Sequence, residues 1–292
     1  MKRCHFDLHA RELVISLGQV TKIMGIVNCT PDSFSGDGLL SFKTFGGDNF
    51  KISCLRLARK LVREGADILD IGGESTRPHA SKVPTSQEIK RVIPVIDALA
   101  RSIKVPISVD TSKFEVARCA LDHGASIVNN VRGNQLTTGF LKLVRDYKAA
   151  IVIMHMRGTP ATMRRYARYK DLMGEIIKEL QISVEKCLEI GIKKERIIVD
   201  PGFGFAKTPE QNLVLLNYLN RFNSLHCPIL IGTSRKSFIG DVLQKPVGKR
   251  VMGTAASVIA GVMQGAHIVR VHDVKPMKEA LKVTDAIINA HA

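Results

Sequence analysis

Short runs of apolar residues recur along the chain, and longer amphipathic stretches separate them. Each run is apolar on consecutive positions, which is typical of strands that are covered on both faces in a parallel sheet. We expect strands at 22–27, 68–71, 106–109, 127–128, 150–155, 196–199, 229–231 and 267–271. Most neighbouring runs are separated by a segment long enough for a helix, for example 52–64, 88–102, 115–123 and 172–190.

Several of these helical segments end in a glycine, which is a common helix C-terminal signal. The glycines are Gly65, Gly124, Gly191 and Gly265. A doubly wound sheet usually has about five or six strands, whereas an α/β barrel has eight and needs roughly 250 residues. The 292 residues contain no linker or low-complexity stretch. We therefore predict an α/β fold of the (β/α)8 TIM-barrel type, as a single domain over residues 1–292.

The amino-acid composition is that of a globular protein rather than a membrane protein. Hydrophobic residues make up 45% of the chain and charged residues 24%, as in a globular protein with a real core. Apolar runs stay well short of the roughly 18 residues of a membrane span, and the N-terminal stretch is too polar for a signal peptide. The six cysteines form no Cys-x-x-Cys pair, which favours reduced thiols over a zinc site. We expect a cytoplasmic protein that does not bind membranes.

The net charge of +16 raises the question of nucleic-acid binding. The basic residues are scattered through helical segments, and only four Tyr and no Trp are present for base stacking. This distribution favours a basic surface and no nucleic-acid partner. A positive field of this kind also attracts anionic small-molecule substrates.

Polar residues follow nearly every predicted strand. In chain order they are Asn28, Asp70, Asp110, Asn129, His155, Asp200, the run 234–237 (Ser-Arg-Lys-Ser), Arg270 and His272. Taken singly, Asp110 could be a helix N-cap and Asp200 could begin a turn. Because the carboxyl ends of barrel strands meet at one rim, where the active sites of such enzymes lie, the whole set predicts an active site.

The loops after the strands add to this picture. The first loop, 24–38, is polar and glycine-rich and could close over a ligand. The second, 70–78, contains Thr76 and Arg77, whose guanidinium suits a phosphate or carboxylate. In the loop after Asp200, Phe203 and Phe205 could form flat apolar walls. Arg270 and His272 stand two apart on an extended segment, so both can face one anion.

These groups suggest a ligand class. Asp110, Asn129 and Asp200 could satisfy the amino and ring N–H groups of a flat heterocycle, and Lys236 could donate to a ring carbonyl or nitrogen. Asn28, Arg270 and His272 would form an anionic end. The pattern therefore predicts a planar nitrogen heterocycle joined to a phosphate-like leaving group.

The motifs that surround these residues resemble the dihydropteroate synthase family of pterin-binding enzymes. The resemblance extends from about residue 22 to residue 285 and rests on the runs 28–35 (NCTPDSFS), 72–78 (GGESTRP), 108–111 (SVDT), 200–204 (DPGFG), 234–237 (SRKS) and 270–272 (RVH). It implies a transferase of folate biosynthesis. Such an enzyme condenses 6-hydroxymethyl-7,8-dihydropterin diphosphate with 4-aminobenzoate to give 7,8-dihydropteroate and diphosphate.

The resemblance also implies residue roles. Asp110, Asn129, Asp200 and Lys236 would hold the pterin, with Met154 on its face. Asn28 would contact the diphosphate and a Mg²⁺ ion, and Arg270 and His272 would complete the anion site. Around the aminobenzoate would lie Thr76, Arg77, Pro78 and Ser237, with Phe34 and Phe205 near its ring. The catalytic set is then Asp110, Lys236, Arg270 and His272.

Further implications are a homodimer formed through helices late in the barrel, and membership of the class of enzymes that sulfonamides target. Loss of diphosphate would leave positive charge on the pterin methylene, which carboxylates stabilise while cations and Mg²⁺ stabilise the leaving group. The weakly basic amine then needs no dedicated general base. The chain departs from the family pattern at Cys29, Asn130 and Arg132, which affects the details of the first and fourth loops.

Two alternatives remain. A pterin-binding methyltransferase acting on methyltetrahydrofolate with a corrinoid partner would share Asp110, Asn129 and Asp200, but it has no need of the 234–237 and 270–272 motifs. A catalytically silent paralogue that only binds a ligand would more easily have lost Lys236 or Arg270, and both are present.

Overall fold

The computed structural model describes residues 3–30, 48–75, 82–132 and 136–290. Among them, eight parallel strands form one sheet in the order β8-β7-β6-β5-β4-β3-β10-β9. The strands are β3 (Lys22–Asn28), β4 (Ile68–Gly72), β5 (Ile107–Asp110), β6 (Ile127–Asn130), β7 (Ala150–Met154), β8 (Ile197–Asp200), β9 (Leu230–Ile231) and β10 (Ile268–Val271). A parallel bridge between Val199 and Ile229 joins the two end strands, so the sheet becomes a nearly closed barrel.

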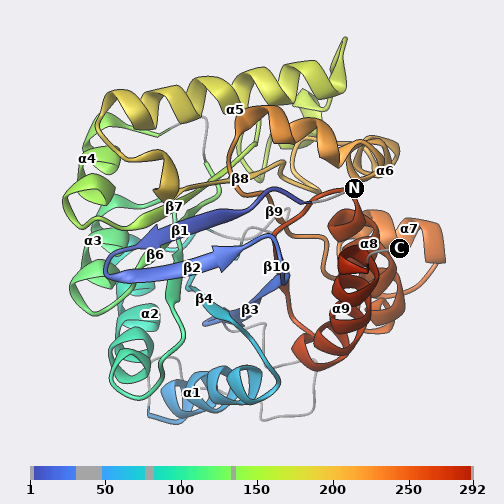
Figure 1. Cartoon of the computed structure of the whole chain (residues 1–292). Coiled ribbons are helices and arrows are strands. Elements are labelled where there is room, and N and C mark those ends of the chain that lie inside the picture. Colours follow the sequence, from blue (N-terminus) through green and yellow to red (C-terminus); the bar gives the residue numbers. More distant parts are fainter. Residues whose placement is uncertain (1–2, 31–47, 76–81, 133–135, 291–292) are drawn as a thin grey trace.

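Helices surround the barrel (Figure 1). In the described residues the α-helices are α1 (Asp48–Arg63), α2 (Thr85–Ala100), α3 (Phe114–Asp122), α4 (Thr138–Asp146), α5 (Leu172–Glu189), α6 (Pro209–Asn217), α7 (Ser237–Leu243), α8 (Val251–Met263) and α9 (Val274–Asn289). Their apolar positions recur every three or four residues, as in α2, which buries Val92, Val95, Ile96 and Leu99. A helix such as α2 therefore packs one apolar stripe against the outside of the barrel.

An antiparallel hairpin precedes the barrel and was not predicted from the sequence. It consists of β1 (Phe6–Ala10) and β2 (Leu13–Leu17), paired from Phe6 opposite Leu17 to Ala10 opposite Leu13. Its inward side chains join one apolar cluster with residues at the amino ends of the barrel strands, such as Met24, Ile68 and Ile268. The hairpin therefore covers the amino-terminal end of the barrel. The carboxyl ends of the strands, which we call the rim, lie at the opposite end.

The predicted barrel is confirmed. Each predicted strand is present, and its ends lie within two residues of the observed ones. The four glycines expected at helix ends all have positive φ, from 92° at Gly191 to 106° at Gly124. L-residues seldom adopt this conformation, so glycine is favoured at these positions. No helix in the described part of the chain is long and apolar enough to cross a membrane.

Candidate active site

Four polar side chains from four strands meet at the rim. The Arg270 guanidinium, from β10, donates through Nε to Asp70 Oδ2 and through Nη2 to Asp110 Oδ2, both at 2.6 Å. Asn129, at the end of β6, donates from Nδ2 to the same Asp70 oxygen at 3.0 Å. A carboxylate can only accept here, so the Asn129 amide must turn its nitrogen toward Asp70 and its oxygen away. This oxygen is then available as an acceptor.

Burial shifts the pKa values of the acidic and basic side chains at the rim. It raises the pKa of Asp110 to about 7, against the opposing effect of Arg270, and it raises the pKa of Asp200 to about 6. Burial also lowers the pKa of Lys236 to about 8, with the charge of Arg270 acting in the same direction. Burial alone would lower the pKa of Arg270, but the neighbouring carboxylates of Asp70 and Asp110 raise this pKa above the ordinary value. Groups poised near neutrality in one site are typical of active sites.

The loop from β8 to α6 binds Asp200, the last residue of β8, and passes next to the Lys236 side chain. Asp200 Oδ1 accepts a hydrogen bond from the backbone N–H of Gly202 at 2.8 Å. Gly202 and Gly204 have φ of 74° and 77°. A Cβ at Gly202 would lie 1.9 Å from the His155 carbonyl oxygen, and one at Gly204 would lie 3.2 Å from Lys236 Cδ. Both glycines thus allow close approaches that a side chain would prevent.

An apolar cluster lies beside these charges. Met154 and Phe205 belong to it, together with Met156, Met163 and Ala206, and it is separate from the main core. Lys236 Nζ lies 4.3 Å from the centre of the Phe205 ring, in cation–π geometry. The rim therefore combines acceptors, a cation and a small apolar wall. This combination suits a flat polar ring.

The loop after β9 carries the motif Ser-Arg-Lys-Ser. Ser234 Oγ lies 3.0 Å from His272 Nδ1, and the His272 backbone N–H donates to the same hydroxyl. Arg235 makes two hydrogen bonds with Asp273, at 2.6 and 3.0 Å. Lys236 precedes α7, whose first residue is the exposed Ser237. Arg235 thus anchors the loop at the rim, while Lys236 is a second cation there, beside Arg270, that feels the charges of Asp200 and Asp110.

The remaining predicted site residues divide into two groups. Asn28 ends β3 and is half-buried, and its side chain makes no hydrogen bond with the part of the chain that the structure describes. Thr76, Arg77, Pro78 and Phe34 lie outside the described residues. No group of three or more His, Cys, Asp or Glu suited to a metal occurs among the described residues.

Two sequence-based interpretations are wrong. Phe203 is not a wall of the site, because it is 1% exposed and packs in the main core, where its ring centre lies 6.4 Å from that of Phe238. His155 follows β7 as expected, but its ring bonds to Lys207 and Glu179 rather than to the Asp70–Arg270 group.

The three departures from the family motifs have simple local structures. Cys29 is fully buried, and the neighbouring Cys54 thiol and burial raise its pKa well above the ordinary value. Asn130 is also buried, and its Oδ1 accepts a hydrogen bond from the Arg132 backbone N–H at 2.7 Å. Asn130 therefore serves to shape the turn after β6.

For two residues that make several contacts at the site, the sequence predicted no specific contact. Asp70 was recognised as a strand-end residue, but only the structure shows that it binds Arg270 and Asn129 together. Lys207 follows the Gly-Phe-Gly-Phe run and is 9% exposed. A lysine so close to a glycine-rich site loop was the available signal, because lysine is seldom buried without several partners.

Comparisons with known proteins agree with this geometry. Residues 24–272 match the family model described as "Pterin binding enzyme". The dihydropteroate synthase of Synechocystis is 45% identical over 271 residues, which cover 92% of this chain and 91% of that protein. The Yersinia pestis dihydropteroate synthase, solved with a sulfonamide drug, superposes with a TM-score of 0.89 at 39% identity, covering 98% and 100% of the two chains. The Xanthomonas albilineans dihydropteroate synthase with 4-aminobenzoic acid gives 0.88 at 36%, covering 99% and 100%.

Proposed function

Since this chain belongs to the pterin-binding enzymes, and among them to the dihydropteroate synthases, we propose that its rim holds a pterin diphosphate while 4-aminobenzoate displaces the diphosphate. The activity is a transferase reaction of folate biosynthesis that yields 7,8-dihydropteroate. The observation that carries the assignment of the rim is the Arg270 guanidinium, which spans Asp70 and Asp110 beside Asn129.

At the pterin end, acceptors face a ring that carries amino and N–H groups. Asn129 presents its amide oxygen, because its nitrogen is bound to Asp70. Asp110 and Asp200 contribute carboxylates, and Lys236 donates to a ring carbonyl or nitrogen. Met154 supplies the apolar surface for the ring face, and Phe205 lies in the same apolar cluster. These groups match the hydrogen-bond donors of a planar nitrogen heterocycle. A sugar phosphate would not use the two carboxylates as well.

At the anion end, Arg270 and His272 bind the diphosphate. Arg270 uses Nε and Nη2 for Asp70 and Asp110, so Nη1 is the nitrogen that it can offer to the anion. The Asn28 amide oxygen is a hard ligand of the kind that Mg²⁺ accepts, and Mg²⁺ is commonly held by few protein groups plus phosphate oxygens and water. The donor set thus fits Mg²⁺, which when bound would neutralise charge on the departing diphosphate.

The reaction breaks the bond between the pterin methylene carbon and the diphosphate oxygen, and the electron pair leaves with the diphosphate. Positive charge develops on the methylene and spreads into the ring, where Asp110 and Asp200 stabilise it. The aminobenzoate nitrogen then forms the new bond to carbon and releases a proton to solvent. We assign six residues to the aminobenzoate: Thr76, Arg77, Pro78, Ser237, Phe34 and Phe205.

We also propose a homodimer through the late helices. Exposed apolar side chains gather on consecutive elements there: Val242 and Leu243 on α7, Val247 just after it and Met252, 80% exposed, on α8. Large apolar side chains grouped in this way favour a protein interface over a solvated surface.

We further propose a cytoplasmic location. The six free cysteines support it, because free thiols suit a reducing compartment.

The proposed activity is tested by mixing the protein with the pterin diphosphate, 4-aminobenzoate and Mg²⁺ and measuring diphosphate. Release that depends on aminobenzoate, together with formation of dihydropteroate, supports the assignment. A sulfonamide should suppress this release. Diphosphate release that is absent, or that proceeds equally without aminobenzoate, contradicts it.

A further inference from the structure

The loop from β8 to α6 closes around a buried lysine. Lys207 Nζ lies 3.0 Å from the carbonyl oxygens of Gly202 and Phe205 and 3.1 Å from His155 Nδ1. Burial lowers the pKa of Lys207 to about 7, while the charges of Asp200 and Glu179 favour its protonated form. In that form the lysine has three N–H donors and no acceptor, and each donor has one of these three partners. Two of the acceptors belong to the loop itself. The backbone of residues 202–205 therefore curves around the Lys207 side chain and is held there by these two hydrogen bonds.

His155 links this lysine to helix α5. Its Nδ1 must accept from Lys207, so the ring proton sits on Nε2, which lies 3.1 Å from Glu179 Oε2. Burial, together with the nearby Lys207 charge, lowers the pKa of His155 to about 4, which keeps the ring neutral. Burial opposes the charge on Glu179, but hydrogen bonds from His155 and Arg157 hold its pKa at about 2.

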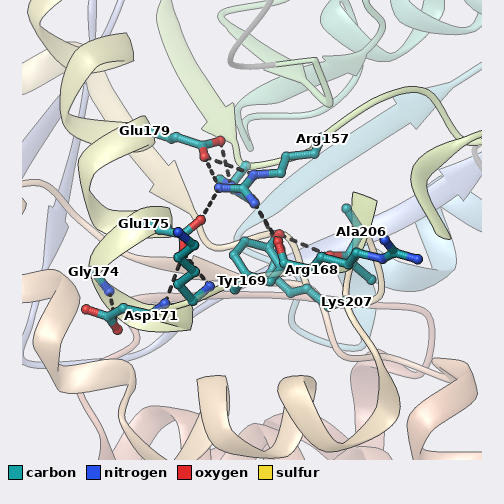
Figure 2. Close-up of polar contacts among 12 residues, drawn as sticks. Arg157, Arg168, Tyr169, Asp171, Gly174, Glu175, Glu179, Ala206 and Lys207 are labelled. Atoms are coloured by element: carbon teal, nitrogen blue, oxygen red, sulfur yellow. Dashed lines mark hydrogen bonds and ion pairs between the residues drawn. The ribbon is translucent and has the colours of Figure 1, made fainter. Parts of the chain in front are cut away.

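Arg157 and Tyr169 connect Glu179 back to the β8–α6 loop. Arg157 Nε donates to Glu179 Oε1 at 2.9 Å, and its guanidinium carbon lies 4.2 Å from the centre of the Tyr169 ring. The Tyr169 hydroxyl in turn donates to the Ala206 carbonyl oxygen at 3.0 Å. Figure 2 shows Arg157 between the carboxylates of α5 and the Tyr169 ring, with Ala206 and Lys207 on the far side. We call these five side chains, Lys207, His155, Glu179, Arg157 and Tyr169, the Lys207 network.

The network supports a loop whose backbone is unfavourable on its own. Gly202, Gly204 and Ala206 all have positive φ, and at Ala206, where φ is 48°, the conformation is costly for an L-residue. Such a backbone persists only where its surroundings fix it. Lys207 holds the carbonyls of Gly202 and Phe205, and Tyr169 holds that of Ala206. The strained stretch is thus fixed at three points.

This loop carries the contacts that the pterin end needs. Its Gly202 N–H donates to Asp200 Oδ1, and its Phe205 ring faces Lys236 Nζ at 4.3 Å. The carbonyl oxygen of Phe205, the residue with the ring, is one of the three acceptors of Lys207. A small shift of this carbonyl would move the ring away from Lys236.

We propose that Lys207 is a positioning residue of the pterin pocket, which fixes the Phe205 ring and the Asp200 carboxylate through the carbonyls of the β8–α6 loop. This inference rests on the proposed function of the rim. Burying a lysine costs free energy that an apolar residue of similar length would avoid, so its retention suits placement of the loop rather than stability. Lys207 is not expected to touch either substrate.

The test is steady-state kinetics of Lys207→Met, which keeps the length of the side chain and removes its three donors. We expect the KM for the pterin diphosphate to rise by about tenfold or more, because displacements of about 1 Å in a site can cost up to 10²-fold in rate. The KM for 4-aminobenzoate should rise less, since Phe205 is the one residue among its proposed contacts that lies on this loop. A general loss of structure would instead change both constants together.

The matched control is Lys278→Met. Lys278 Nζ pairs with Asp67 at 3.2 Å near the amino-terminal end of the barrel, and its side chain is 40% exposed. This variant loses a lysine charge away from the rim and should keep both KM values. If Lys207→Met behaves like this control, or if both of its KM values rise equally, the inference is wrong.

Tyr169→Phe keeps the test decisive even if Lys207→Met does not fold. It removes only the hydroxyl that holds Ala206 and should weaken pterin binding by about threefold to tenfold, the value of one hydrogen bond of ~1 kcal/mol. Unchanged pterin binding, measured through the fluorescence of the pterin itself, would overturn the inference. A wild-type protein that releases no aminobenzoate-dependent diphosphate would instead overturn the proposed function, so the two failures are distinguishable.

Discussion

Arg270 and Asp70 are 200 residues apart in the chain, yet Nε of the arginine lies 2.6 Å from Oδ2 of the aspartate. The Asp70 side chain is fully buried, and the same oxygen also accepts from Asn129. One carboxylate therefore orients two groups of opposite role: the cation proposed for the diphosphate and the amide proposed for the pterin. This arrangement makes Asp70 a positioning residue at the junction of the two ends of the site.

Replacing Asp70 with Asn should impair both ends at once. The change leaves the Arg270 charge with one carboxylate fewer in a buried place, and breaking a buried ion pair costs about 3–5 kcal/mol. We expect a lower melting temperature and weaker binding of the pterin diphosphate. Calorimetric titration and thermal unfolding measure the two effects. Asp285→Asn is the control, because it breaks the buried Arg3–Asp285 pair away from the rim and should lower stability while pterin binding stays unchanged.

Asp110→Asn should lower turnover by about 10²-fold or more, which is the scale of losing one preorganised electrostatic contact in a transition state. The variant keeps the shape of the side chain and can still accept a hydrogen bond, but it cannot balance positive charge on the pterin methylene. Single-turnover measurement of dihydropteroate formation separates this step from product release. Near-normal turnover would exclude the charge-stabilising role.

The barrel was predictable from the sequence because each buried strand is an uninterrupted apolar run, as in Ala150–Met154, where all five residues are buried. The hairpin was missed because its inward residues alternate with polar ones. Leu8 and Ala10 are buried, whereas His9 between them is half-buried. Such short alternation, interrupted by Arg11 and Glu12, is a weak signal over five residues.

The position of a residue at a strand end predicted that it lies at the rim, but it did not predict which way its side chain points. Asp110, Asn129, Asp200 and Arg270 come to the rim because parallel strands end together. His155 stands at an equivalent position, yet its ring turns outward to Glu179 on α5. Phe203 and Phe205 are two residues apart in one motif, and only Phe205 lies beside Lys236, because positive φ at Gly204 breaks the simple alternation of side chains. Such differences depend on tertiary contacts that a local pattern does not contain.

The proposed dimer should depend on the apolar group of α7 and α8. Met252→Glu places a charge on a side chain that is 80% exposed, so it should leave the fold of the monomer intact and destabilise an interface formed there. Sedimentation equilibrium should show a shift from dimer to monomer. Ile182→Glu on α5, where the side chain is 50% exposed, is the control and should leave the association state as in the wild type. A wild-type protein that is monomeric at micromolar concentration would contradict the dimer directly.

Asn28→Ala tests the proposed metal contact. Removing the amide oxygen should raise the Mg²⁺ concentration needed for half-maximal diphosphate binding by about tenfold, because few protein groups hold Mg²⁺ in such sites. Titration of Mg²⁺ in a diphosphate-binding assay gives this value without any turnover. Binding that does not respond to Mg²⁺ in the wild type, or that responds identically in the variant, would remove Asn28 from the metal site.

The pH dependence of kcat/KM should be bell-shaped. The pKa of Asp110 is raised to about 7 and that of Asp200 to about 6, so the carboxylates gain protons and lose their charge as the pH falls through this range. The pKa of Lys236 is lowered to about 8, so its cation is lost as the pH rises above that value. The rate should therefore fall on both sides of a maximum between about 7 and 8. Lys236→Arg keeps its positive charge to much higher pH. It should remove the alkaline limb and retain the acidic one, and an unchanged alkaline limb in this variant would assign that limb to another group.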